Sequence, residues 1–187
     1  MPRNEREVFM FRNKLSNLIR KVLVKIVPNL NPPNTMFDHE GTQPYLSRYY
    51  LFRGPKSKDG THPFDAFGRP KNNIIRTNGW SVVLHHFHQS DSTEKLHNHG
   101  WSWGLSFVLA GGYSEEKLIG DKVTRRTIRP FSFNFIRPHE FHRVDLLEKD
   151  AWTLFFRGPR LGEWFYKDRV THNVIKWNEH VTLAKNG

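Results

Sequence analysis

The chain has 187 residues, no cysteine and a formal net charge of +11, and 14% of its residues are aromatic. This composition is typical of one packed domain, and it excludes disulfides, thiolate metal sites and a cysteine nucleophile. No segment reaches the roughly 18 consecutive apolar residues of a membrane span, and the charged N-terminus is unlike a signal peptide. We therefore expect a cytoplasmic protein whose basic excess favours anionic partners.

Residues 5–27 are predicted to form a basic amphipathic helix. Large apolar residues recur there every three or four positions, at Val8, Phe11, Leu15, Leu18, Val22 and Ile26, with Ile19 and Leu23 widening the stripe. Pro28 is expected to end the helix, and a Pro/Asn-rich linker to complete the segment 1–40. We expect the stripe to pack on the rest of the domain or on a second subunit of a homodimer. Contact with an anionic membrane or nucleic acid is the alternative.

From residue 41 to 172 the pattern changes to short strands separated by turn residues. A strand is predicted at 45–52, and the long loop 53–79 after it has the length and basic charge of a lid over an anionic ligand. Further strands are predicted at 80–88, 104–110, 113–119, 122–129, 131–136, 141–147, 151–157 and 161–166. Strands at this spacing indicate an all-β barrel or sandwich. The tail, 173–187, is expected to add a strand or a short helix.

Three histidines are the candidate metal ligands. His97 and His99 are separated by one residue, so on an extended segment both imidazoles point to the same face. His142 lies on a later apolar strand, which a barrel can bring to the same point. Three neutral nitrogen ligands suit one divalent metal ion and leave coordination positions open.

The residues around these histidines resemble the conserved motifs of the cupin superfamily. In that superfamily a His-any-His pair is followed by a glutamate and then by a glycine, and here Gly111 stands seven positions after Gly104. The segment Pro138–His142 resembles the end of the second cupin motif. Within cupins, the stretch from Tyr45 to Phe165 is similar to a small group found in bacteria and their phages. That similarity is carried by residues 45–52, 84–87, 97–99, 111–113, 142–144 and 152–159. The resemblance implies a double-stranded β-helix, or jelly-roll barrel, preceded by the helix.

The chain departs from the cupin pattern at the glutamate, which would fall at Trp103 or Gly104. By resemblance this leaves three histidines and no carboxylate, the arrangement of thiol dioxygenases, with Fe(II) favoured over Mn, Ni or Zn. The Ser-His-Tyr relay of those enzymes is missing, because its positions hold Phe155, Arg157 and Pro159. Cysteine itself is therefore not the expected substrate.

The other candidate site residues are assigned by their nearness to the three histidines. The candidate catalytic residues are Arg157, Glu140 and Tyr113. Arg157 would hold a carboxylate or phosphate of the substrate. Glu140 and Glu94 are the carboxylates nearest to the histidines in sequence. Either would act as a fourth metal ligand or as a general base, or would be a solvated charge on a loop.

The candidate substrate-binding residues are His85, Trp101, Trp103 and Arg143. Alternation along a strand places His85 on the opposite face from His86 and His88, and Arg143 on the opposite face from His142. The tryptophans, like Phe107 and Tyr113, would either stack on a ligand or fill the barrel.

The sequence leaves three functions open. The first is a mononuclear Fe(II) oxygenase-type enzyme that acts on a small or anionic substrate. The second is a cupin that binds a small molecule or sugar without turnover. The third is a metal-free, epimerase-like barrel, for which no acid–base pair is evident in the sequence.

Overall fold

The computed structural model describes residues 3–30, 33–38, 42–53, 79–120, 122–159 and 163–176. The predicted lid loop 53–79 lies outside the described residues except for its two ends, and so does the end of the C-terminal tail.

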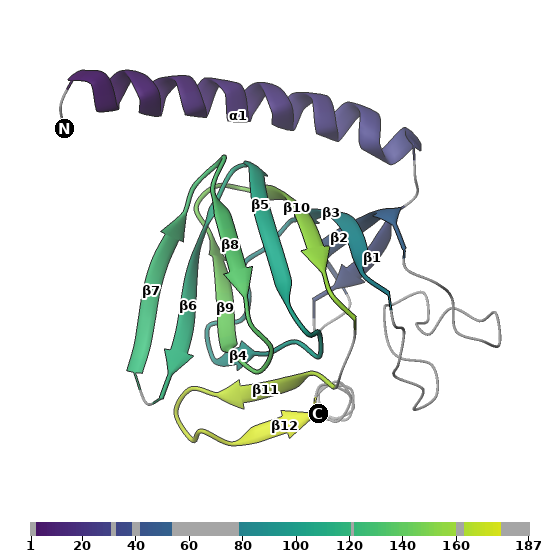
Figure 1. Cartoon of the computed structure of the whole chain (residues 1–187), viewed down its shortest axis with the longest axis vertical. Helices are drawn as coiled ribbons and strands as arrows, with labels where there is room; N and C mark the ends of the chain where they lie inside the picture. The colour runs from purple at the N-terminus through teal and green to yellow at the C-terminus, as the bar shows by residue number, and fades with distance from the viewer. Residues whose placement is uncertain are drawn as a thin grey trace.

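Within these ranges the chain forms the helix α1 (Arg3–Leu30) and two antiparallel β-sheets, drawn in Figure 1. The first sheet has the order β1 (Asn34–Phe37), β2 (Pro44–Phe52), β3 (Ser81–Phe87), β10 (Ala151–Arg157), β5 (Gly104–Ala110) and β8 (Phe133–Ile136). The second has the order β12 (Val174–Lys176), β11 (Phe165–Asp168), β4 (Lys95–His97), β9 (Phe141–Leu146), β6 (Tyr113–Ile119) and β7 (Lys122–Ile128).

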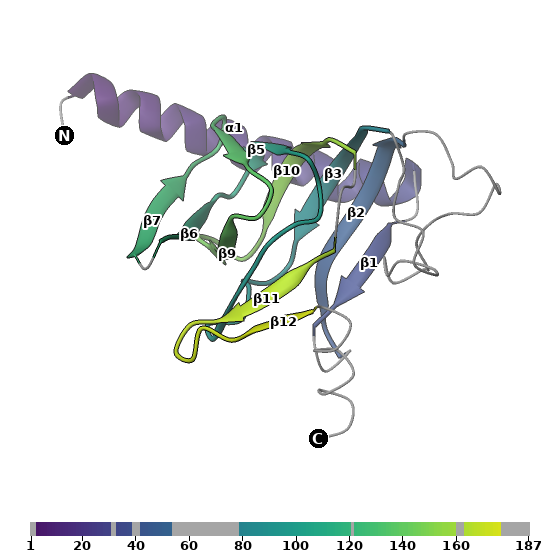
Figure 2. The ribbon, with the colours of Figure 1, turned by 60° about the horizontal axis from the view of Figure 1, so that its bottom comes forward.

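The strand order is that of a jelly roll. From β3 to β10 the strands form two interleaved four-stranded sets, β3-β10-β5-β8 and β4-β9-β6-β7, in which the chain crosses repeatedly from one sheet to the other. The fold is therefore the cupin-type double-stranded β-helix with an N-terminal helix, as expected. Strands β1 and β2 extend the first sheet, and the β11–β12 hairpin extends the second, as Figure 2 shows from below.

Most strand predictions are confirmed, and β5, β6 and β10 match theirs to the residue. The strand predicted at 131–136 begins two residues late, because Phe131 has a φ of 62° in the preceding turn. The strand predicted at 161–166 lies instead at Phe165–Asp168.

Two strands were not predicted. β1 falls on the expected linker and pairs with β2, where the Asn34 side-chain oxygen accepts a hydrogen bond from Arg48. β4 has only three residues, too few for a period to show, and is defined by its pairing with β9 and β11.

α1 lies across one end of the barrel and is attached there by polar contacts with turns (Figure 1). The Gly111 amide donates a hydrogen bond to Ser16 Oγ at 3.2 Å. Arg20 pairs with Asp150 at 2.8 Å and with Glu148 at 2.5 Å. A side chain at Gly111 would not fit, because its Cβ would lie 2.3 Å from the Asp150 carbonyl oxygen.

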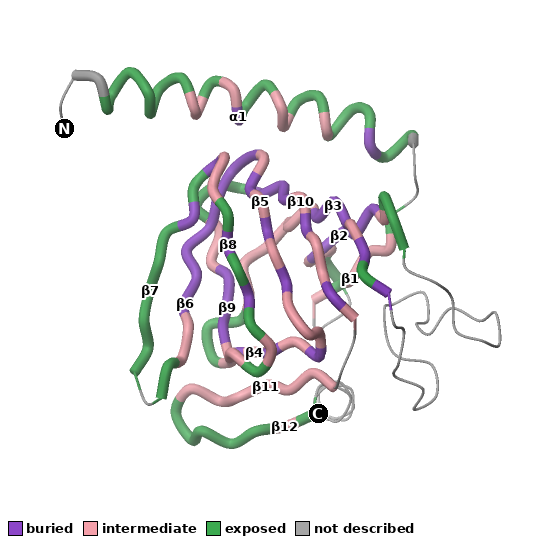
Figure 3. The backbone as a smooth tube through the Cα atoms, viewed as in Figure 1, coloured by how far each residue is buried: buried purple, intermediate pink, exposed green. Residues whose placement is uncertain are grey.

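The alternative in which the apolar stripe of α1 packs on the barrel of its own chain is wrong for most of the stripe. Its members Val8, Phe11, Leu18, Val22 and Ile26 are between 45% and 67% exposed. Figure 3 shows α1 as mainly exposed along its length.

A neighbouring face of α1 faces the barrel instead. Ser16, Leu23 and Val27 lie on it, and Leu23 and Val27 pack on a cluster that includes Trp152 and Leu84. The end of the barrel determines which face of α1 lies against it. The turns there present a backbone amide and carboxylates, which Ser16 and Arg20 can bind and apolar side chains cannot.

The prediction that Pro28 ends the helix is also wrong. Pro28 lies inside the last turn, and α1 continues to Leu30. The Asn29 side-chain amide donates to the Lys25 carbonyl at 2.8 Å, which helps to hold the turn around the proline.

We predict that Arg20→Met loosens α1 from the barrel. Asp150 is buried, so removing the guanidinium beside it should lower the free energy of unfolding by about 2 kcal/mol. Urea unfolding at neutral pH measures this loss. The control is Lys21→Met at the next, exposed position, and equal stabilities for the two variants would contradict the prediction.

Candidate metal centre

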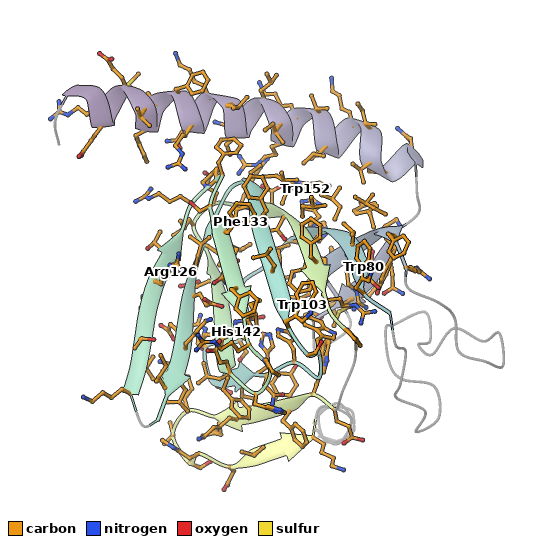
Figure 4. All side chains as sticks on the ribbon, in the orientation of Figure 1. Trp80, Trp103, Arg126, Phe133, His142 and Trp152 are labelled. Atoms are coloured by element: carbon orange, nitrogen blue, oxygen red, sulfur yellow. The ribbon has the colours of Figure 1, made fainter. Side chains whose placement is uncertain are left out.

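His97, His99 and His142 come together inside the barrel. His97 at the end of β4 is the register partner of His142 on β9, so the two side chains share one face. The three residues each offer a ring nitrogen, and these atoms lie within 4.8 Å of one another. Figure 4 places His142 in the half of the barrel near β11, away from α1. The convergence that the sequence predicts is thus present in the structure.

Carboxylates stand behind two of the three imidazoles. Glu115 Oε1 lies 2.7 Å from His142 Nδ1, and both side chains are almost fully buried. Asp91 Oδ2 lies 3.6 Å from His97 Nδ1. A carboxylate at Nδ1 favours a proton on that nitrogen and leaves Nε2 as the lone-pair donor.

Asp91 is itself held in place by two donors. The Tyr45 hydroxyl donates to one of its oxygens, and the Val144 amide donates to the other at 2.6 Å. Burial, and then the Asp91 charge, raise the pKa of Tyr45 well above its ordinary value, so Tyr45 stays a donor.

Burial keeps the ring nitrogens available as ligands. It lowers the pKa of His97 to about 4, against the opposing charge of Asp91, and lowers the pKa of His99 well below its ordinary value. Burial alone would raise the pKa of Glu115, but its hydrogen bond to His142 holds that pKa below the usual range. At pH 7 the imidazoles of His97 and His99 are therefore neutral, and Glu115 is an ionised carboxylate.

The geometry of the three nitrogens fits a divalent ion. His99 Nε2 and His142 Nε2 lie 2.8 Å apart, near the roughly 3 Å that separates two nitrogens bound at right angles to one metal ion. His99 Nδ1 is buried without a hydrogen-bond partner among the described residues.

Aromatic rings surround the three histidines. Trp101 stacks on His99 with a centroid distance of 4.1 Å, and Trp164 meets the same imidazole edge-on at 5.3 Å. Phe155 contacts Trp101 at 5.0 Å and stacks on His85 at 4.8 Å. His85 and Trp101, both predicted site residues, thus lie beside the histidine cluster.

Two arginines create positive charge next to His85. Arg48 is its register partner on β2 and is 8% exposed, and Arg157 lies on the same face of β10 as Phe155. Burial and then these two charges lower the pKa of His85 to about 3. Burial lowers the pKa of Arg157 too, and Arg48 adds to that shift. Within the described ranges, neither arginine forms an ion pair.

The structure does not bring the other predicted residues to the three histidines. Glu140 pairs with Lys117 at 2.9 Å, and Arg143 pairs with Glu116 at 3.4 Å on the opposite face of β9. Tyr113 packs in an apolar cluster, where its hydroxyl accepts a hydrogen bond from Asn134 and burial raises its pKa to about 12.

Trp103 and Gly104, the two positions where the cupin glutamate would fall, both pack against neighbouring residues. Trp103 packs against the backbone at Gly158, and Glu94 is exposed. A side chain at Gly104 would be crowded, because a Cβ there would lie 2.9 Å from the Phe155 ring.

Sequence reasoning missed Glu115, Asp91 and Trp164. Alternation along Tyr113–Ile119 does place Glu115 on the same face as the apolar Tyr113, which was the available signal. Asp91 and Trp164 lie in loops, and only the fold brings them to the site.

Comparison with known proteins gives structural similarity alone. No protein-family model and no curated protein sequence matches the chain. Solved structures that resemble it include Fe(II) HppE with substrate, at 11% identity and a TM-score of 0.47 over 70% of this chain and 57% of that one. KdgF from Halomonas sp. matches at 17% identity and a TM-score of 0.42, over 64% of this chain and 84% of that one.

A hydroxypropylphosphonic acid epoxidase from S. wedmorenis matches at 13% identity and a TM-score of 0.44, over 70% of this chain and 56% of that one. The chain thus spans little more than half of the length of HppE and of the epoxidase. The assignment of the fold rests on the strand order of this chain itself.

We predict that the protein binds one divalent ion per chain and that His97→Ala together with His99→Ala abolishes binding. Glu115→Gln should weaken binding about 10–100-fold, because the amide no longer orients His142 as a carboxylate does. Metal analysis after anaerobic Fe(II) loading, with titration for affinity, measures both effects. Glu116→Gln, on the outer face of the same strand, is the matched control. Wild-type protein that stays free of metal would refute the prediction.

A second prediction concerns stability in acid. His85 is neutral in the folded protein down to about pH 3, whereas in the unfolded chain its pKa is near the ordinary 6.5. The unfolded state therefore takes up the extra proton, and stability falls as the pH drops from about 6.5 towards 3. Between pH 7 and pH 5 the wild type should lose about 2 kcal/mol more than His85→Gln. Urea unfolding at both pH values tests this, with exposed His172→Asn as the control, which should behave like the wild type.

Proposed function

We propose that this protein is a mononuclear metal-dependent enzyme of the Fe(II) oxygenase type that acts on a small anionic molecule. The observation that carries the proposal is the buried three-histidine cluster, whose ring nitrogens lie within 4.8 Å of one another. His97, His99 and His142 would hold the metal ion. Bound there, the ion would supply Lewis acidity and open coordination positions, and three neutral ligands would leave its charge uncompensated.

The protein's own residues would position the substrate. Arg48 and Arg157 have buried guanidinium nitrogens, Nε in Arg48 and Nη1 in Arg157, that have no hydrogen-bond partner in the part of the chain that the structure describes. Buried cations are costly unless they are paired, so an anionic group that docks between them would be favoured over a neutral one. Trp101 and Phe155 would cover the space between this charge and the metal ligands and exclude water from it.

A metal-free barrel is the second candidate. It is favoured by the His142–Glu115 pair, whose 2.7 Å hydrogen bond is the kind of unit that moves a proton in an epimerase-like reaction. Binding of a small molecule without turnover needs neither the metal nor this pair. A homodimer and contact with nucleic acid remain predictions.

Dioxygen uptake by the Fe(II)-loaded protein tests the proposal. With a panel of small carboxylates and phosphate esters, one class should stimulate uptake, and His97→Ala with His99→Ala should abolish it. Arg48→Met with Arg157→Met should raise KM at least tenfold with a smaller effect on kcat, since the arginines hold the anion in the ground state as well as the transition state. Exposed Arg126→Met is the control. Turnover by metal-free protein would instead establish the second candidate.

A further inference from the structure

α1 exposes more apolar surface than its attachment to the barrel explains. Phe11 is 67% exposed, Leu18 59% and Val8 57%, and Val22 and Ile26 are about half exposed. With 3.6 residues per turn, these five side chains fall within about 80° of the helix circumference. They form one stripe along the helix, which we call the outer stripe. Contiguous apolar surface of this kind is typical of an interaction site.

Positive charge borders the outer stripe on the side away from the barrel. Lys14, Lys21 and Lys25 are exposed and fall within about 40° of the circumference next to it. From residue 8 to residue 30 the helix sequence contains no acidic residue. The partner of this face must therefore accept both apolar side chains and a row of cations.

We propose that α1 docks the protein on an anionic membrane surface, with the helix lying in the plane of the interface. An anionic bilayer matches both features, since the outer stripe enters the region of the acyl chains while the lysines contact lipid phosphates. A second copy whose α1 packs antiparallel on the outer stripe would bring lysines against lysines, and nucleic acid offers no surface for the apolar residues. α1 has no stretch long and apolar enough to cross a membrane, so it would lie on the surface.

The position of α1 is compatible with an accessible metal centre. α1 covers one end of the barrel, and His142 lies in the half near β11, as Figures 1 and 4 show. Docking through α1 would leave the histidine cluster on the side of the protein that faces away from the membrane.

Cosedimentation with lipid vesicles tests the proposal on the full-length protein. We expect binding to phosphatidylcholine vesicles that contain about one third phosphatidylglycerol, and at least tenfold weaker binding to phosphatidylcholine alone. The triple variant Phe11→Ser, Leu18→Ser, Val22→Ser should lose binding in low and high salt. The charge-reversed variant Lys14→Glu, Lys21→Glu, Lys25→Glu should bind the anionic vesicles more weakly, by about fivefold or more for each lysine. The effect should be largest in low salt.

Two control variants match these changes elsewhere on the surface. The first control is the double variant Val123→Ser, Val170→Ser, which removes exposed apolar side chains from the barrel. The second is the triple variant Lys122→Glu, Arg126→Glu, Lys149→Glu, which changes the net charge by the same amount as the lysine variant of α1. Both should bind like the wild type, and circular dichroism confirms that every variant is folded. Equal losses for the two charge variants would overturn the proposal, since any surface charge would then serve. Absence of vesicle binding would also overturn it. The mass in solution tests the alternative of a second copy. If the wild type has the mass of two chains and the variant Phe11→Ser, Leu18→Ser, Val22→Ser has the mass of one, the stripe is assigned to a second copy instead.

Discussion

The pairing of the short strand β4 with β9 is the constraint on which the site depends. It sets His97 opposite His142, and two residues later the chain returns His99 to the same side. β4 is held on its other edge by β11, where Tyr166 is the register partner of His97. A shift of one residue in either pairing would turn the imidazole of His97 out of the barrel, because side chains alternate between the faces of a sheet.

The buried carboxylates explain how a cluster of imidazoles is tolerated inside an apolar barrel. Three imidazoles crowded together in an apolar interior need hydrogen-bond partners for their ring N–H groups. Glu115 accepts a hydrogen bond from His142, and Asp91 lies beside the ring nitrogen of His97. The carboxylates are held in turn by other donors: Tyr45 and Val144 bind Asp91, and Asn134 binds Glu115. The result is a network in which each buried carboxylate has hydrogen-bond donors around it, which is the condition for burying it.

The two ends of the barrel have different chemistry. The end near β11 combines the histidine cluster with aromatic rings and with Arg48 and Arg157, which form no ion pair among the described residues. The other end is closed by α1 through Ser16 and Arg20 and by the packing of Val27 on the first sheet. This separation allows the helix to meet a partner without obstructing the site.

The sequence by itself determined the class of fold and the metal-ligand candidates. Strand periods, turn residues and the His-any-His pair are local patterns, and β5, β6, β10 and the three-histidine convergence follow from them. Glu115, Asp91 and Trp164 could not be found in this way, because strand pairing and loop packing bring them to the histidines from distant positions. The packing face of α1 was likewise decided by the tertiary structure. Apolar periodicity predicts which side of a helix avoids water. Here the amide of Gly111 and the carboxylate of Asp150 required the polar groups of Ser16 and Arg20 as partners. Because those two residues face the barrel, the more apolar stripe of the helix faces outward.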